Sequence, residues 1–265
     1  MKLCFSNIAW SKKENKEIID LFNQEKIRYL EYAPDLIIKN FKKKENIFKV
    51  KKFWQKKKIK LYSMQSVLYR VKNAFVFGDN NQQNIFYNGV KEKVLLAKKL
   101  GTKVIVFGSP KSKKTFGKSK KILNYLFESN MRKIAQICEK AKITFCLEAN
   151  PKVYGTKYLT HTNQALSLVK KIDNKYFKLN LDLGTIISNN ENYKKLIKNN
   201  IFYIGHAQIS LPKLKNPLIN KKLIERFILE LNKNRYKKII SVEFLKQEKN
   251  SCSGIVELIK FIKNV

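Results

Sequence analysis

Residues Lys142 to Gly155 read KITFCLEANPKVYG, an apolar run that predicts a strand ending on one carboxylate, Glu148. Side chains of a strand alternate between its two faces, so Glu148 shares a face with Cys146 and Asn150. Pro151 then ends the strand, because proline has no N–H to donate to a sheet. Taken alone, a glutamate in this position is most simply a solvated loop residue. The stretch by itself therefore predicts a strand and no more.

Three later stretches repeat the pattern. FKLNLDLG at 177–184 ends a strand on Asp182, IFYIGHAQIS at 201–210 ends one on His206, and KIISVEFL at 238–245 ends one on Glu243. A single acid means little, but four successive strands that end on Glu, Asp, His and Glu indicate a shared site.

Four further strands and eight helices follow from the spacing of apolar residues. The strands are Lys2–Asn7, Ile27–Ala33, Ile59–Gln65 and Lys103–Gly108. The helices are Glu14–Gln24, Phe41–Lys57, Val90–Leu100, Ile122–Ala141, Asn163–Ile172, Glu191–Ile197, Lys221–Lys233 and Gly254–Lys263. The polar residues up to Asn84 predict an irregular connection before the third of these helices.

Eight strand–helix units in 265 residues predict an α/β fold, a single (β/α)8 TIM barrel that forms one domain over residues 1–265. An open doubly wound sheet usually has fewer strands and a glycine-rich phosphate loop, and the sequence contains no GxGxxG or GxxxxGKS/T motif. No low-complexity linker or change in composition divides the chain.

The barrel prediction brings the four strand-end side chains to one rim, because active sites of such barrels lie at the C-terminal ends of the strands. Three carboxylates so close together repel one another unless a cation lies among them. Carboxylates with one imidazole suit a divalent ion such as Mn2+, Mg2+, Co2+ or Zn2+. We therefore expect one divalent metal ion, with His206 as its nitrogen ligand and His161, the other histidine, in a loop.

The charge of the chain is strongly positive, with 56 Lys and Arg against 20 Asp and Glu, which gives +36. Such a balance invites a nucleic-acid or anionic-surface partner. However, the lysines are spread over nearly every predicted helix and loop, and Lys, Asn and Ile are abundant together. A general residue bias produces the same pattern, so we interpret the charge as solvated surface and do not expect nucleic acid as a partner.

Cysteine usage and hydropathy predict a cytoplasmic protein. The four cysteines form no CxxC pair, and most lie in or beside apolar segments, as reduced core thiols do. No apolar run reaches the ~18 residues that span a bilayer, so no membrane association is expected. The first ten residues alternate like a strand and lack the features of a secretory signal.

Longer motifs carry a resemblance to a known family. The motifs are CLEANPKVYGTKYLTHTNQAL, LNLDLGT, IGHAQISLPKL, LYSMQSVLY and LGTKVIVFGSPK, which together extend over most of the chain. The chain resembles the xylose-isomerase-like barrels, the sugar (phosphate) isomerases and epimerases, and a branch of them in which Asn-Pro and Tyr-Gly follow the strand-five acid. The motifs are more specific for this superfamily than for a substrate.

The resemblance implies a metal-dependent isomerase or epimerase of a small sugar or sugar-phosphate, acting through an enediolate. It implies that the metal ligands are Glu148, Asp182, His206 and Glu243. It also implies that Glu148 and Glu243 are the catalytic pair, one removing a proton and the other returning one.

The sequence departs from the family where many members carry a histidine three residues after the strand-six acid, because Thr185 stands there. This places the familiar ketose-epimerase substrates in doubt. The substrate-binding residues that we predict are Gln65, Asn150, Thr185, Gln208 and Lys246. Lys111 and Lys246 are candidate phosphate partners, although lysines are so frequent that one lies near any strand end.

Three other functions compete with an isomerase or epimerase. An apurinic-site endonuclease shares the fold and would explain the positive charge, but it needs a three-metal cluster with several histidines, and the chain has two. A sugar dehydratase or lyase begins with the same enolisation, and the sequence does not exclude it. A non-catalytic basic barrel that binds an anionic partner is the third, and the intact Glu148 and Glu243 argue against it.

Overall fold

The computed structural model describes residues 2–246 and 251–265, which form a closed barrel of eight parallel strands in chain order. The first strand pairs with both the second and the eighth, and this pairing closes the barrel. The strands are β1 (Leu3–Ser6), β2 (Tyr29–Tyr32), β3 (Lys60–Met64), β4 (Val104–Phe107), β5 (Thr144–Leu147), β6 (Phe177–Asp182), β7 (Ile204–Ile209) and β8 (Ile240–Val242). The predicted (β/α)8 barrel is confirmed.

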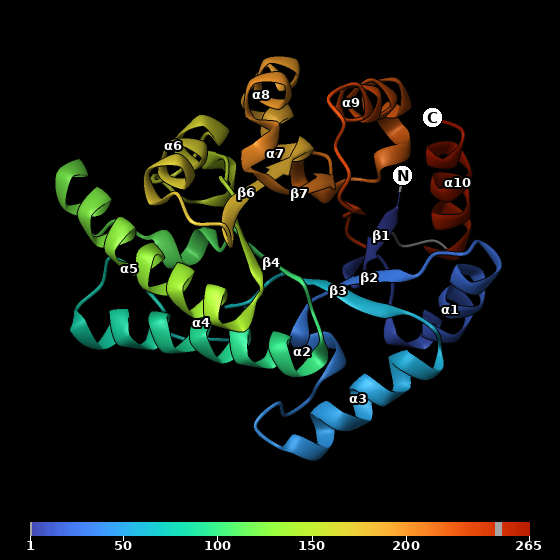
Figure 1. The fold of residues 1–265 in the computed structure, drawn as a ribbon, viewed down its shortest axis with the longest axis horizontal. Helices are drawn as coiled ribbons and strands as arrows, with labels where there is room; N and C mark the ends of the chain where they lie inside the picture. The colour runs from blue at the N-terminus through green and yellow to red at the C-terminus, as the bar shows by residue number, and fades with distance from the viewer. Residues whose placement is uncertain (1, 247–250) are drawn as a thin grey trace.

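The helices surround the strands (Figure 1). They are α1 (Asn15–Gln24), α2 (Pro34–Ile37), α3 (Lys44–Lys56), α4 (Asn80–Leu100), α5 (Lys120–Ala141), α6 (Thr162–Ile172), α7 (Leu183–Ser188), α8 (Tyr193–Asn200), α9 (Lys221–Lys233) and α10 (Ser251–Lys263). The last helix, α10, packs beside α1, so the two ends of the chain meet and complete the outer layer (Figure 1). No helix of the described segments is long and apolar enough to cross a membrane.

Aromatic side chains join the barrel to this outer layer. The rings of Phe107 and Phe145 stack at 5.3 Å, and those of Phe145 and Phe177 at 5.9 Å, across three neighbouring strands. Phe86 of α4 packs edge-on against Phe107 at 5.8 Å. Because strand side chains alternate, the residues directly before and after each of these aromatics on its strand face the inside of the barrel. The interior holds polar groups together with a small apolar cluster of Val104, Val106 and Cys146.

Three helices differ from the sequence predictions, and one of them, the short helix α2, was not predicted. The third long helix begins at Asn80 rather than Val90, because Asp79 accepts a hydrogen bond from the backbone of Gln82, whose side chain accepts one from Asp79 in return. The short helix α7 was not predicted. It begins directly after Asp182, whose carboxylate accepts the N–H of Thr185.

The prediction that the seventh strand ends on His206 is wrong. This strand, β7, continues to Ile209, and all six of its residues are buried. His206 therefore lies in the middle of the strand. Gln208 lies two residues further along the strand, which corresponds to roughly 6.5 Å. His206 is therefore deeper in the barrel than a residue at the strand end would be.

Candidate functional site

Polar side chains fill the inside of the barrel in two layers, which the register of β6 and β7 defines. Asp182 lies opposite Gln208, whereas Asn180 lies opposite His206. Residues two apart share a face, so Asp182 and Gln208 form the upper layer, toward the C-terminal ends of the strands. His206 belongs to the layer beneath.

The lower layer, which we call the floor cluster, consists of Glu31, Ser63, His206 and Ser241, all without exposed surface. Nε2 of His206 lies 3.1 Å from Oε2 of Glu31 and 2.9 Å from Oγ of Ser241. Both serine hydroxyls donate to the same glutamate oxygen, at 2.7 and 3.0 Å. In the floor cluster, the buried carboxylate of Glu31 is thus stabilised by several hydrogen-bond partners.

Glu31 shows this stabilisation in its pKa. Burial alone would raise it, but the hydrogen bond and charge of His206, with hydrogen bonds from Ser63 and Gln208, outweigh burial and lower the pKa. The other oxygen of Glu31 accepts Nε2 of Gln208 at 2.8 Å. Both carboxylate oxygens are therefore held.

Glu148, directly after β5, belongs to the upper layer. It accepts the side-chain amides of Asn150 and Asn180, each at 2.9 Å. Burial and the negative charge of Asp182 nevertheless raise its pKa to about 8, against the opposing charge of Lys113. Glu148 is therefore a carboxyl group that gains and loses its proton near neutral pH.

Asp182 and Glu243 complete the upper carboxylates. Asp182 accepts Oγ of Ser210 and the N–H of Thr185, but burial still raises its pKa. For Glu243, burial and the charges of Glu31, Glu148 and Asp182 raise the pKa well above its usual value. The three carboxyl groups influence one another electrostatically, and unlike the floor cluster they lack a counter-ion among themselves.

A cavity of about 260 Å³ opens onto this layer, and both Glu148 and Glu243 line it. Gln65, Asn150 and Lys111 line the same cavity. Neutral amides beside two acids suit a polar, hydroxyl-bearing ligand. Of the predicted site residues, this cavity brings together the catalytic pair and two substrate-binding candidates, Gln65 and Asn150.

Lys113 lies behind Asn150 with no exposed surface. Its ammonium donates to Oδ1 of Asn150 at 2.8 Å, and the amide nitrogen of Asn150 donates to Glu148, so a chain links the lysine to the acid. Burial lowers the pKa of Lys113 to about 7 in spite of Glu148. Gly108 makes room for this chain, because a Cβ there would lie 2.7 Å from Glu148 and 2.8 Å from Asn150.

The structure does not bring the four predicted metal ligands together. His206 lies in the floor cluster, and its Nε2 is engaged by Glu31 and Ser241. Across residues 2–246 and 251–265, no group of three or more His, Cys, Asp or Glu side chains is arranged to hold a metal ion. The residues present therefore do not fit the expected centre of three carboxylates and one imidazole.

The other three substrate-binding candidates do not line the cavity. Thr185 donates its hydroxyl to the carbonyl of Ala149 at 3.0 Å. Gln208 is fully buried and bridges the two layers. Lys246 is partly exposed and forms an ion pair with Glu14 at 3.3 Å.

Sequence reasoning missed three polar residues that contact the two layers: Glu31, Asn180 and Lys113. Glu31 had a usable signal, since it is the one acid in the apolar run IRYLEYA. Asn180 precedes Asp182 by two residues and so shares its face. Lys113 had no signal, because nothing in the sequence distinguishes it from its many neighbouring lysines.

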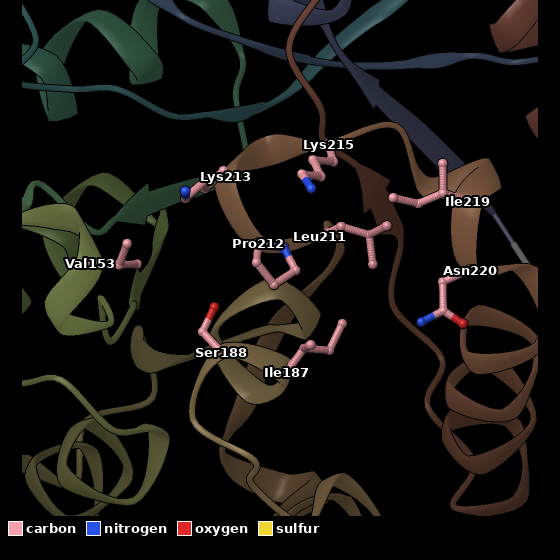
Figure 2. Close-up of a pocket in the computed structure, with 9 residues that line it drawn as sticks. All are labelled: Val153, Ile187, Ser188, Leu211, Pro212, Lys213, Lys215, Ile219 and Asn220. Atoms are coloured by element: carbon pink, nitrogen blue, oxygen red, sulfur yellow. The ribbon is translucent and has the colours of Figure 1, made fainter.

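A second hollow, of about 500 Å³, lies beside the end of β7 (Figure 2). Its lining combines apolar Val153, Ile187 and Ile219 with Lys213 and Lys215, and it includes no acidic residue. The backbone N–H of Lys213 donates to the Tyr154 hydroxyl at 2.9 Å. Burial chiefly, with the charges of Asp182, Glu148 and Glu243, raises the pKa of Tyr154.

Comparison with curated proteins gave no match. Among solved structures, 3-keto-D-glucoside 4-epimerase YcjR from E. coli has a TM-score of 0.81 at 13% identity, with 100% of both chains covered. D-allulose 3-epimerase from Methylomonas sp., in complex with D-allulose, has a TM-score of 0.78 at 13% identity, covering 100% of this chain and 96% of that one. The IOLI protein, in a structure with a bound zinc atom, has a TM-score of 0.73 at 16% identity, covering 100% and 96%.

At such identities these likenesses show the fold alone. A sequence family provides the stronger assignment. The family described as xylose isomerase-like TIM barrel matches residues 26–265, which is nearly the whole chain. The chain therefore belongs to the xylose isomerase-like TIM barrel family.

Proposed function

We propose that this protein is a sugar isomerase or epimerase in which Glu148 and Glu243 transfer a proton at the carbon next to a carbonyl. One observation carries the proposal: two glutamates with raised pKa, the half-buried Glu148 and the buried Glu243, line the same cavity. Paired acids with raised pKa are typical of general acid–base sites. The epimerase names of structural neighbours and the family membership support the same chemistry.

The proposed reaction needs one ionised and one protonated carboxyl group. The ionised glutamate removes the proton from the carbon, and the electron pair of that C–H bond moves to the carbonyl oxygen and forms an enediolate. The protonated glutamate then delivers its proton. Delivery to the opposite face of the same carbon restores the carbonyl and gives an epimer. Delivery to the neighbouring carbon gives an isomer, because the hydroxyl proton then passes to the former carbonyl oxygen and the new carbonyl forms at the adjacent carbon. Acid–base catalysis of this kind contributes about 10²- to 10⁴-fold to a rate.

The raised pKa values suit this division of labour. Glu148 and Glu243 influence each other electrostatically, and two such carboxylates do not both ionise readily, so one keeps its proton while the other gives it up. The chain from Lys113 through Asn150 reaches Glu148 only. Its positive charge favours ionisation of that group, and we assign Glu148 as the base in the first step and Glu243 as the acid.

The proposed substrate is a small sugar or sugar-phosphate. Gln65 and Asn150 offer amide groups to its hydroxyls, and Lys111 is the lysine of the cavity lining that a phosphate would meet. The expectation of one bound divalent ion stays a prediction, and no step above depends on it.

Deuterium exchange tests the proposal. The purified protein is incubated in D2O with a panel of aldoses and ketoses, free and phosphorylated, and the loss of the C–H signal is followed by NMR. We expect exchange with at least one sugar, and its loss in both Glu148→Gln and Glu243→Gln. Glu128→Gln is the matched control, because Glu128 forms ion pairs with Arg132 and Lys171 on the helical surface.

The outcome also separates the competing reactions. Exchange with formation of an epimer or isomer supports the proposal, whereas loss of water from the sugar identifies a dehydratase. Exchange that persists in both glutamate variants would exclude their catalytic roles.

A further inference from the structure

We infer that Gln208, not His206, occupies the β7 position of the carboxylate layer, so that the natural site presents no imidazole and binds Zn2+ and Co2+ only weakly. The inference concerns the pocket of the proposed function, but its readout is metal binding and does not require turnover. It predicts that one substitution, Gln208→His, builds the missing transition-metal site.

The register of the sheet is the first support. Gln208 pairs with Asp182, one of the upper carboxylates, while His206 pairs with Asn180 one layer below. An imidazole at position 208 would start from the same level as Asp182. The imidazole at position 206 starts about two residues deeper, among the side chains of the floor cluster.

The partners of His206 are the second support. Its Nε2 contacts Glu31 and Ser241, and all three residues are fully buried. To ligate a metal through this atom, the ring would have to leave Glu31, and a buried carboxylate would lose a hydrogen-bond partner. The other ring nitrogen, Nδ1, has no hydrogen-bond partner in the described part of the chain, and no cluster of three potential ligands forms there.

The amide of Gln208 is the third support, because both its nitrogen and its oxygen already have hydrogen-bond partners. Its Nε2 donates to Glu31 at 2.8 Å, and its Oε1 accepts Nδ2 of Asn180. Asn180 also donates to Glu148. Gln208 therefore links the floor cluster to the carboxylates as a hydrogen-bonding bridge.

The positions of Gln208 and His206 predict a measurable preference among metal ions. Imidazole is a preferred ligand of Zn2+ and of the late transition metals, whereas sites of oxygen ligands alone favour Mg2+, Mn2+ or Ca2+. Adding an imidazole at position 208, beside three carboxylates, supplies the ligand type that the natural upper layer lacks. Removing His206 takes away none of the oxygen atoms of that layer.

The first test compares metal affinity in the wild-type protein and the Gln208→His variant. Co2+ binding is followed by its visible absorption and Zn2+ binding by competition, with the apo proteins as starting material. We expect weak binding by the wild type and at least about tenfold tighter binding by the variant. Equal affinity in the two proteins, or tight binding already in the wild type, would overturn the inference.

The second test needs no variant, because the chain contains only two histidines, His161 and His206. Long-range 1H–15N spectra report each ring, and the exposed His161 serves as the internal reference. We expect the His206 nitrogen signals to stay in place when one equivalent of Zn2+ is added. A shift of a His206 ring nitrogen to a metal-bound position would show that it is a ligand and overturn the inference.

The two proposals fail separately. Absence of deuterium exchange with every sugar would remove the proposed function but leave the metal preference measurable. Tight Zn2+ binding through His206 would remove the inference while the proton-transfer roles of the two glutamates stayed testable.

Discussion

The two polar layers inside the barrel both contain carboxyl groups, but the pKa values of these groups are shifted in opposite directions. In the floor cluster, Glu31 has His206 and two serine hydroxyls as partners, and its pKa is lowered. In the upper layer, Glu148 and Glu243 lie near further carboxylates, and their pKa values are raised. The difference separates a structural buried charge, which is compensated, from a functional one, which is left ready to exchange a proton.

The largest expected effect comes from removing proton transfer in the upper layer. Glu148→Gln and Glu243→Gln each keep the size of the side chain but cannot accept or donate the proton. We expect kcat to fall by at least about 10²-fold in each variant, with a smaller change in KM. Steady-state kinetics on the sugar identified by exchange measures both quantities, and Glu128→Gln provides the control.

The same comparison predicts a stability effect in the floor cluster. His206→Ala leaves the carboxylate of Glu31 buried without its imidazole hydrogen-bond partner, so we expect the free energy of unfolding to fall by about 1–3 kcal/mol. His161→Ala, at an exposed position, should change it by no more than about 0.5 kcal/mol. Urea denaturation measures both variants, and equal stabilities would contradict the role of the floor cluster.

The raised pKa of Glu148 predicts that its contribution to stability falls as the pH rises. Its pKa is about 8 in the folded protein against 4.5 in the reference state, so between these values the folded state binds more protons than the unfolded state. The contribution of Glu148 to stability is therefore present at low pH and lost as the pH rises from about 4.5 through about 8. Glu148→Gln should flatten this slope in denaturation curves recorded between those pH values.

Lys113 opposes the effect of Glu148 on stability above about pH 7. Its pKa is about 7 in the folded protein and 10.5 in the reference state, so above pH 7 the unfolded state binds more protons. Stability then rises with pH through the contribution of this lysine. Curves that show the same slope for the wild type and Glu148→Gln below pH 7 would contradict the raised pKa of Glu148.

A matched pair of lysines gives the smallest expected effect. Lys111 lines the cavity, whereas Lys246 forms an ion pair with Glu14 away from it. If the substrate carries a phosphate, Lys111→Met should raise its KM by about tenfold, equivalent to about 1.4 kcal/mol, and Lys246→Met should leave it unchanged. The reverse result would place the phosphate beside Lys246 instead.

The fold was predictable from the sequence because its signals are local. Apolar runs such as KVIVFG mark strands that are buried on both faces, and eight of them alternate with amphipathic helices. The early start of α4 was also within reach, because Asp79 and Gln82 have the spacing of a capping box. The polar run NNQQN hid the beginning of that helix.

The chemistry of the site was only partly predictable. Glu148 and Glu243 follow their strands directly, so a strand-end pattern finds them. His206 and Gln208 share one face of β7, and only the pairing with β6 shows which of them lies level with Asp182. Lys113 reaches the site through a loop between β4 and α5, where sequence spacing carries no information about distance.

The most direct test of the contrast between the two layers is a carboxyl titration by 13C NMR, with Glu148→Gln and Glu31→Gln used to assign the signals. We predict that Glu148 titrates near pH 8, while Glu31 loses its proton below the usual range of glutamates and stays ionised at neutral pH. A Glu148 signal that titrates between about pH 4 and 5, as surface glutamates do, would contradict the account.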